Sequence, residues 1–334
     1  PTKRTGQYGE KQMAFSFPTN AMRTALFAGL IGAFATGTPA RAQDFIGILT
    51  GGTSGVYYPM GVAISKIFSE KIKGSRPSVQ ATKASVENLV LLQQGKGEIA
   101  FTLGDSLAFA WEGNEEAGFK TKQTKLRGLA AIYPNFVQIV ASKESGIKTL
   151  ADLKGKRLSV GAPKSGTELN ARAILAAAGI TYKDLGKIEY LPFGESVDLM
   201  KNRQLDATLQ SAGLGVAAIR DLASSVPINV VEIPASIVEK TGAPYIKGVI
   251  PKGTYTGQDS DVQTAAVVNY LVTRSDLSEN VVYEMTKSIF ENLDELRAAH
   301  SAAKDIDIKR ALEGMPVPVH PGAEKYLKER GVTK

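Results

Sequence analysis

Two turns built from small residues are the part of this sequence whose residue types and spacing could do chemistry. The first reads Thr50-Gly-Gly-Thr-Ser-Gly55 and the second reads Gly161-Ala-Pro-Lys-Ser-Gly-Thr167. Each turn lies between a short apolar run and an amphipathic helical pattern. A turn of Gly, Ser and Thr that opens a helix presents unpaired backbone N–H groups and the positive end of the helix dipole. Such a turn can bind a carboxylate or another anion.

The two turns belong to a longer internal sequence repeat. A Ser-Val-acid triplet follows each of them, and Ser85 lies as far beyond Ser54 as Ser196 lies beyond Ser165. One anion-binding turn in each of two lobes would form a clamp around a small anionic ligand.

Candidate ligand-binding residues gather at these turns and at the ends of predicted strands. Gln210 and Ser211 follow a strand, at the carboxyl end where open α/β sheets bind ligands, although a plain tight turn would look the same. Asp105 ends an earlier strand and could receive a ligand ammonium group or cap the next helix. Of Tyr57 and Tyr58, we expect one in the core and one facing the cleft. The full candidate set is Gly52, Thr53, Ser54, Tyr57, Ser85, Asn88, Asp105, Tyr133, Ser165, Gly166, Thr167, Gln210 and Ser211.

Several kinds of chemistry find no support in the residues. The chain has no cysteine, which excludes disulfides, thiol nucleophiles and cysteine-ligated metals. His300 and His320 are the only histidines; they lack metal-ligand spacing, and we expect both on the surface. No Gly-x-Ser-x-Gly elbow is present. We therefore expect no catalytic residue, no metal ion and no cofactor.

The formal charge of +7 is concentrated at the start of the chain. Residues 43–334 are nearly balanced and carry no basic stripe, which argues against a nucleic-acid partner. Residues 22–42 read as a signal peptide, with a charged start, an apolar run and Ala40-Arg41-Ala42 as a cleavage site. We expect an exported protein cleaved near Ala42/Gln43, with an uncleaved membrane anchor as the alternative. Met13 and Met22 are both possible starts.

The order of apolar runs predicts an α/β fold in which a βαβαβ unit occurs twice. We expect two lobes, each a mostly parallel sheet flanked by helices, joined by two hinge crossings at 129–141 and 267–273. Residues 43–134 plus 270–334 would form lobe 1 and residues 135–269 lobe 2, after an extension and signal peptide in 1–42. Ser85 should cap a helix, residues 280–299 should form one helix, and the proline-rich tail should wrap around the fold. The remaining predictions are strands at 45–49, 79–82, 99–103, 156–161, 188–192, 207–210 and 230–233, a short helix at 149–153, and helices from 59, 165–178 and 196–203.

Several segments resemble a known family. Ile48-Leu-Thr-Gly-Gly-Thr-Ser-Gly-Val-Tyr-Tyr-Pro-Met-Gly61 looks like the opening signature of TAXI-type solute receptors of TRAP transporters. Similar matches are Ala84-Ser-Val-Glu-Asn-Leu89, Leu205-Asp-Ala-Thr-Leu-Gln-Ser-Ala-Gly213, Ile250-Pro-Lys-Gly-Thr-Tyr-Thr-Gly257, Phe290-Glu-Asn-Leu-Asp-Glu-Leu296 and Val319-His-Pro-Gly-Ala-Glu324. They follow one another over nearly all of the chain after residue 42.

The resemblance implies a two-lobed periplasmic-binding-protein fold of type II. It also implies a receptor that closes on a small anionic organic solute and delivers it to the membrane permease subunits of a TRAP transporter. The solute would be an amino acid or a dicarboxylate, such as glutamate or 2-oxoglutarate. Many relatives have a proline and a different turn where this chain has Gly213-Leu-Gly-Val216, so the solute is not carried over with the fold. A ligand sensor for a signalling receptor and an enzyme on the same fold remain alternatives.

Overall fold

Two βαβαβ units with the same strand order form the fold in the computed structural model, which describes residues 45–333. The predicted signal segment lies outside the described residues. The first unit comprises β1 (Phe45–Leu49), α1 (Tyr57–Lys71), β2 (Arg76–Gln80), α2 (Ser85–Gln93) and β3 (Ile99–Leu103). The second comprises β5 (Arg157–Ser159), α4 (Gly166–Ala177), β6 (Lys187–Glu189), α5 (Phe193–Lys201) and β7 (Ala207–Ala212).

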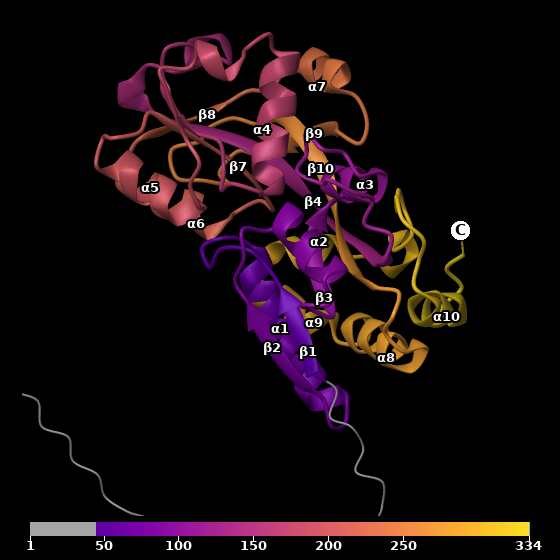
Figure 1. The fold of residues 1–334 in the computed structure, drawn as a ribbon. Helices are drawn as coiled ribbons and strands as arrows, with labels where there is room; N and C mark the ends of the chain where they lie inside the picture. Colours follow the sequence, from indigo (N-terminus) through magenta and orange to yellow (C-terminus); the bar gives the residue numbers. More distant parts are fainter. Residues whose placement is uncertain (1–44, 334) are drawn as a thin grey trace, which may run out of the picture. The chain divides into compact units, whose positions relative to one another are not determined.

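Two long strands join these units into one hydrogen-bonded sheet. Its order is β2-β1-β3-β10-β4-β7-β5-β6, where β4 is Leu126–Ser142 and β10 is Val262–Arg274. Within each unit the strands are parallel, and the long strand beside it is antiparallel. The two halves therefore repeat the same arrangement. In Figure 1 the first unit lies below and the second above, with β4 and β10 between them.

The remaining elements complete the two lobes. The first lobe adds α3 (Gly104–Glu112), α8 (Glu279–Phe290), α9 (Leu293–Ala299) and α10 (Pro321–Glu329), and the second adds α6 (Ala217–Ser225), β8 (Ile228–Val231), α7 (Ala235–Thr241) and β9 (Ile246–Ile250). Short 3-10 turns occupy Lys143–Ser145, Ala151–Leu153, Tyr182–Asp184, Ser301–Asp305 and Ile308–Arg310.

Helices cover both faces of the first-lobe sheet at β1 and β3, whereas no residue of the edge strand β2 is buried. Ile46 and Ile48 pack with α1 in one core cluster, while Leu49 packs with Leu89 and Leu92 of α2 in another. For the same reason every residue of β3 is buried. A parallel strand that is covered on both faces has no side turned to solvent.

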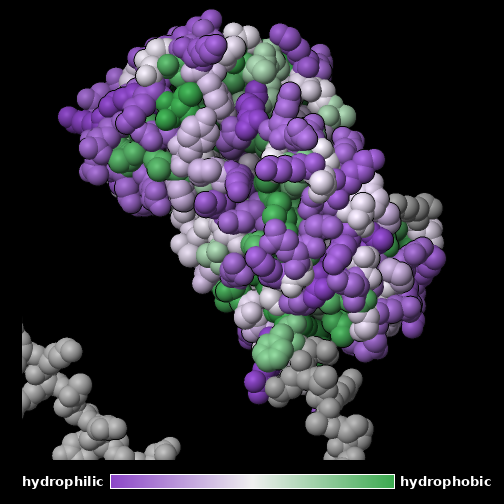
Figure 2. All heavy atoms as spheres, viewed as in Figure 1, coloured by the Kyte–Doolittle hydropathy of each residue, from purple (hydrophilic) through white to green (hydrophobic). Residues whose placement is uncertain are grey.

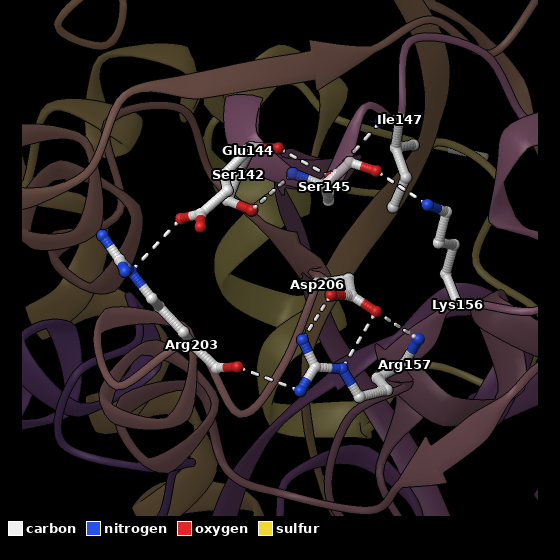
Figure 3. Close-up of polar contacts among 8 residues, drawn as sticks. All are labelled: Ser142, Glu144, Ser145, Ile147, Lys156, Arg157, Arg203 and Asp206. Carbon is white, nitrogen blue, oxygen red and sulfur yellow. Dashed lines mark hydrogen bonds and ion pairs between the residues drawn. The ribbon is translucent and has the colours of Figure 1, made fainter.

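In the second lobe, a bidentate ion pair fastens β5 to β7 at the end away from the crossings. The Arg157 guanidinium donates to both Asp206 carboxylate oxygens, at 3.0 and 2.6 Å, and the Arg157 backbone N–H adds a 2.8 Å bond to Asp206 Oδ2. Figure 3 shows this pair, together with the bond from Lys156 Nζ to the Ser145 carbonyl and the contact between Arg203 and Glu144. Arg157 holds the pKa of Asp206 below its ordinary value, mainly through the side-chain hydrogen bond.

Several predicted elements differ from the structure. The second strand covers 76–80 rather than 79–82, and residues 280–299 form two helices, α8 and α9, that are separated at Asn292. The tail was expected only to wrap, but α10 begins at Pro321. Pro321 occupies a first-turn position, where its fixed φ favours a helix, and the His320 side chain caps the helix by accepting from Gly322 N–H. A surface position was predicted for His320, but the structure buries it.

The exterior is mainly polar in the view of Figure 2, with hydrophobic residues in small separate groups. Across residues 45–333, no helix combines the length and the apolar character needed to cross a membrane.

Candidate ligand-binding site between the lobes

A cavity of about 110 Å³ lies between the two βαβαβ units. The first lobe contributes residues around the start of α1, the segment before α2 and the end of β3. The second lobe contributes the turn before α4, the start of α5 and the end of β7. The lining residues are Gly51, Gly52, Gly55, Val56, Tyr57, Thr82, Lys83, Ala84, Ser85, Leu103, Asn135, Ala162, Ser165, Gly166, Thr167, Pro192, Phe193, Ser211 and Ala212.

The start of α4 forms the second-lobe wall. Ser165 is the N-cap, and its hydroxyl accepts a 3.1 Å hydrogen bond from Glu168 N–H. Gly166 and Thr167 are the first two helical residues, whose N–H groups have no acceptor within a helix. Within the described residues, the Thr167 hydroxyl has no hydrogen-bond partner either, and Thr167 lines the cavity. The α4 start therefore presents two N–H donors and a hydroxyl, in the positive field of a 12-residue helix.

The first-lobe wall touches the α4 turn directly. A Cβ on Gly166 would lie 2.6 Å from Ser85 Oγ and 2.7 Å from Leu103 Cδ1, so only glycine fits this contact. The Glu87 N–H donates a 3.2 Å hydrogen bond to the Lys164 carbonyl. The structure thus has its lobes in contact around the cavity.

Backbone strain marks both sides of this contact. Ala84 has φ 72° and ψ −153°, a region that residues other than glycine rarely occupy, and Lys164 has φ 62°. The Ala84 N–H donates to the Thr82 hydroxyl at 3.0 Å, which helps to fix this conformation. Ser85, which was expected to cap α2, does not do so. Its side chain instead accepts a 3.1 Å hydrogen bond from Leu103 N–H, because the strained residue before it turns the serine toward β3.

The floor of the cavity is a chain of buried amides where β4 and β10 cross between the lobes. The Asn269 side chain donates to the Tyr133 carbonyl at 2.8 Å and to Asn135 Oδ1 at 2.7 Å, and it accepts from the Tyr57 hydroxyl. Asn135 in turn donates to the Ser211 carbonyl at 2.9 Å. This row of hydrogen-bonded side chains therefore joins the first lobe to the second through the crossing strands.

A second polar cluster joins the lobes beside the cavity. Asp105, at the start of α3, is 1% exposed. Its Oδ2 accepts from Asn170 Nδ2 at 2.6 Å and from the Tyr245 hydroxyl at 2.8 Å. Asn170 also accepts from the Ser211 hydroxyl, which links this cluster to the cavity wall. Burial raises the pKa of the Asp105 carboxyl, against the effect of hydrogen bonds from Tyr245 and Ser106, which lower it.

The structure brings about half of the predicted site residues to the cavity. Those that line it are Gly52, Tyr57, Ser85, Ser165, Gly166, Thr167 and Ser211. Those that do not are Thr53, Ser54, Asn88, Asp105, Tyr133 and Gln210.

Two of the residues away from the cavity hold neighbouring elements together. The Asn88 amide donates to the carbonyls of Thr50 and Phe101, at 2.7 and 2.8 Å, and so ties α2 to β1 and β3. Ser54 contributes its carbonyl to a 3.3 Å bond from Ala218 N–H across the lobes. These two are structural ties in the present conformation.

Two buried candidates retain unused polar groups. Within the described residues, both side-chain polar atoms of Gln210 lack a partner, as does the hydroxyl of Tyr133. Gln210 faces the opposite side of β7 from Ser211, whose side chain contacts Asn170 of α4, because successive residues of a strand alternate.

Sequence reasoning missed Asn135 and Asn269. A signal existed, because each is a single amide within a strongly apolar run, and a buried amide in such a run must find partners. The sequence could not show that those partners would be each other and Tyr57.

The site offers binding groups rather than a reactive set. Among residues 45–333, its lining contributes hydroxyls, an amide, helix-start N–H groups and one residue of a charged type, Lys83, which is exposed. No cluster of potential metal ligands occurs in this part of the chain.

Comparison with known proteins identifies the fold class first. The structure is similar to one described as a periplasmic transporter, at 10% identity and a TM-score of 0.57, covering 87% of this chain and 93% of that one. It is similar to the periplasmic binding protein BugD, at 10% identity and a TM-score of 0.55, covering 86% and 94%. A putative L-cystine ABC transporter from Listeria monocytogenes matches at 15% identity and a TM-score of 0.50, covering 79% and 98%. At such low identity these likenesses establish the two-lobed periplasmic-binding-protein fold alone, as predicted.

The family follows from the sequence itself. The model of the NMT1-like family matches residues 48–331, and the chain belongs to that family.

Proposed function

We propose that this protein is an extracytoplasmic solute-binding receptor that captures a small anionic organic solute between its two lobes. The observation that carries the proposal is the cavity between the lobes, whose wall includes the start of α4 with its N–H groups that have no acceptor within the helix. A site that is contributed by both lobes binds tightly only when the lobes are together. Binding and closure are then one event, as a transport receptor requires.

The charge of the solute is argued from the donors around it. The N–H groups of Gly166 and Thr167, the Thr167 hydroxyl and Lys83 can all give hydrogen bonds to a carboxylate, and helix-start N–H groups favour anions. Hydrogen bonds to a charged group contribute about 1.5–3 kcal/mol each. A carboxylate at the α4 turn would satisfy donors that no other group of the described chain satisfies.

The partner and the location rest on the resemblance and on the segment before residue 43. We propose that the protein is exported, cleaved near Gln43, and delivers an amino acid or dicarboxylate to the membrane subunits of a TRAP-type permease. We propose the lobe boundaries at 134/135 and 269/270, because Asn135 and Asn269 mark the crossing of β4 and β10 between the lobes.

The test is binding without turnover. Protein freed of co-purified solute by unfolding and refolding would be titrated calorimetrically with a panel of amino acids, dicarboxylates and monocarboxylates. We expect saturable binding of at least one acid, with the acid recovered unchanged. At a solute concentration about 100 times Kd, the folded state should gain about 2.7 kcal/mol. Chemical conversion of the bound acid, or no binding by any acid, would contradict the proposal.

A further inference from the structure

The charges around the cavity bear on the class of solute. Among the lining residues in the described part of the chain, Lys83 is the only one with a charged side chain, and neither Asp nor Glu lines the cavity. Within residues 45–333, no carboxylate lies within ion-pair distance of Lys83 Nζ. An ammonium group enclosed here would lose water and gain no counter-charge, which strongly disfavours its burial.

The carboxylates on neighbouring elements are occupied elsewhere. Asp105 accepts from Asn170 and Tyr245 and does not line the cavity. Glu87 accepts a 2.6 Å hydrogen bond from Lys83 N–H. Glu168 is paired with Arg172 and accepts from the Tyr182 hydroxyl at 2.9 Å. None of the three is free to receive a ligand cation in this conformation.

The neutral polar groups of the wall are also largely engaged. Ser85 and Ser165 accept from backbone N–H groups, Ser211 donates to Asn170, and Asn135 both donates and accepts within the floor. Between them lie the apolar surfaces of Val56, Leu103, Ala162, Pro192, Phe193 and Ala212. The O–H donors that Ser85 and Ser165 retain both lie at the α4 turn, at the end of the cavity where the first carboxylate binds. The apolar walls suit a hydrocarbon chain.

We infer that the solute is a small monocarboxylic acid with an apolar body and no amino group. This inference rests on the proposed function and narrows its solute class. The carboxylate lies at the start of α4 and beside Lys83, and the chain lies against the apolar walls. A 2-oxo group is compatible with this arrangement, because it accepts hydrogen bonds and carries no charge.

Matched acid pairs test the inference. Pyruvate and the 2-oxo acids of valine and leucine would be titrated beside alanine, valine and leucine, and 2-oxoglutarate beside glutamate. We expect the best monocarboxylate to bind at least 100-fold more tightly than its amino partner and more tightly than 2-oxoglutarate. Tighter binding of an amino acid or a dicarboxylate would overturn this inference and leave the proposed receptor function intact. Binding of no acid at all would overturn both.

A pair of lysine variants tests the placement of the carboxylate. Lys83→Gln should weaken binding of the preferred monocarboxylate roughly tenfold. Lys164→Gln is the matched control, because Lys164 is exposed and close to the site but does not line the cavity. Equal effects of the two variants would show that general surface charge, and not a contact in the cavity, favours the anion.

Discussion

The Asn170 side-chain amide donates a 2.6 Å hydrogen bond to the Asp105 carboxylate across the boundary between the lobes. Because Asn170 also accepts from the cavity residue Ser211, one side chain contacts both the lobe boundary and the binding site. Asp105 has no cationic partner in the described chain, so its burial is compensated by hydrogen bonds alone.

Asp105 should make stability fall as the pH rises. Burial raises its pKa in the folded protein, so the folded state binds the proton better than the unfolded state does. Its stabilising contribution is complete below the unfolded pKa of about 3.9 and is lost as the pH rises through the folded pKa. Urea unfolding between pH 4 and 8 should give a shallower decline for Asp105→Asn than for the wild type. Parallel pH profiles would contradict this role.

Asp206 should have the opposite dependence. Its pKa is lowered by Arg157, so its contribution is present above about pH 4 and is lost as the pH falls toward the folded pKa. Asp206→Asn should cost about 2 kcal/mol at neutral pH, a value reduced by the partial exposure of Arg157. Glu144→Gln is the control, since its contact with Arg203 is exposed and should change stability by less than about 0.5 kcal/mol. Comparable losses in the two variants, by denaturant unfolding, would be the contrary result.

Thr167 should affect binding, and Ser165 should affect folding. Thr167→Ala removes a hydroxyl that faces the cavity, so affinity for the preferred acid should fall roughly tenfold, or 1.4 kcal/mol, with little change in the solute-free melting temperature. Thr167→Ser should retain most of the affinity. Ser165→Ala removes the α4 cap and should cost about 1 kcal/mol of stability. Calorimetry and thermal melting of the three variants separate the roles, and unchanged affinity in Thr167→Ala would remove this residue from the site.

Ala84→Gly should stabilise the protein. The conformation of Ala84 costs about 1–3 kcal/mol in a residue with a Cβ and almost nothing in glycine. The greater entropy of glycine in the unfolded chain offsets about 0.5–1 kcal/mol of that gain. Ala81→Gly, at an exposed position just upstream, has no such strain to release and should be neutral or destabilising. A lower denaturation midpoint for Ala84→Gly would show that the strain is not released.

Local patterns predicted the repeated units well and the contacts between them poorly. The apolar spacing of residues such as Ile64, Ile67 and Phe68 identified α1, and Ser165 was correctly expected at the start of α4. These features depend on neighbours within one or two turns. The role of Ser85 depends instead on Leu103 and on the strained Ala84, which no local pattern reports.

The same limit applies to the cavity floor. Asn135 and Asn269 meet only because β4 and β10 pair in one particular register across a wide sequence separation. The hydrogen bonds that Asp105 accepts likewise require Asn170 of α4 and Tyr245 of the loop between α7 and β9. Residue type indicated that Asp105 could bind an ammonium group, but the tertiary fold brings other hydrogen-bond donors to its carboxylate oxygens.

The pairing of β4 with β10 has a mechanical consequence. The ladder between the two strands is irregular at two places, between Val268 and Tyr270 and between Leu271 and Val272, and at the first of them the Asn269 side chain bonds to the Tyr133 carbonyl of β4. Bending of the joint should concentrate in this short segment, because deforming the regular ladder elsewhere would stretch several hydrogen bonds at once. Amide hydrogens at 268–272 should therefore exchange faster than those of the flanking ladder, and the lobes should rotate about this segment.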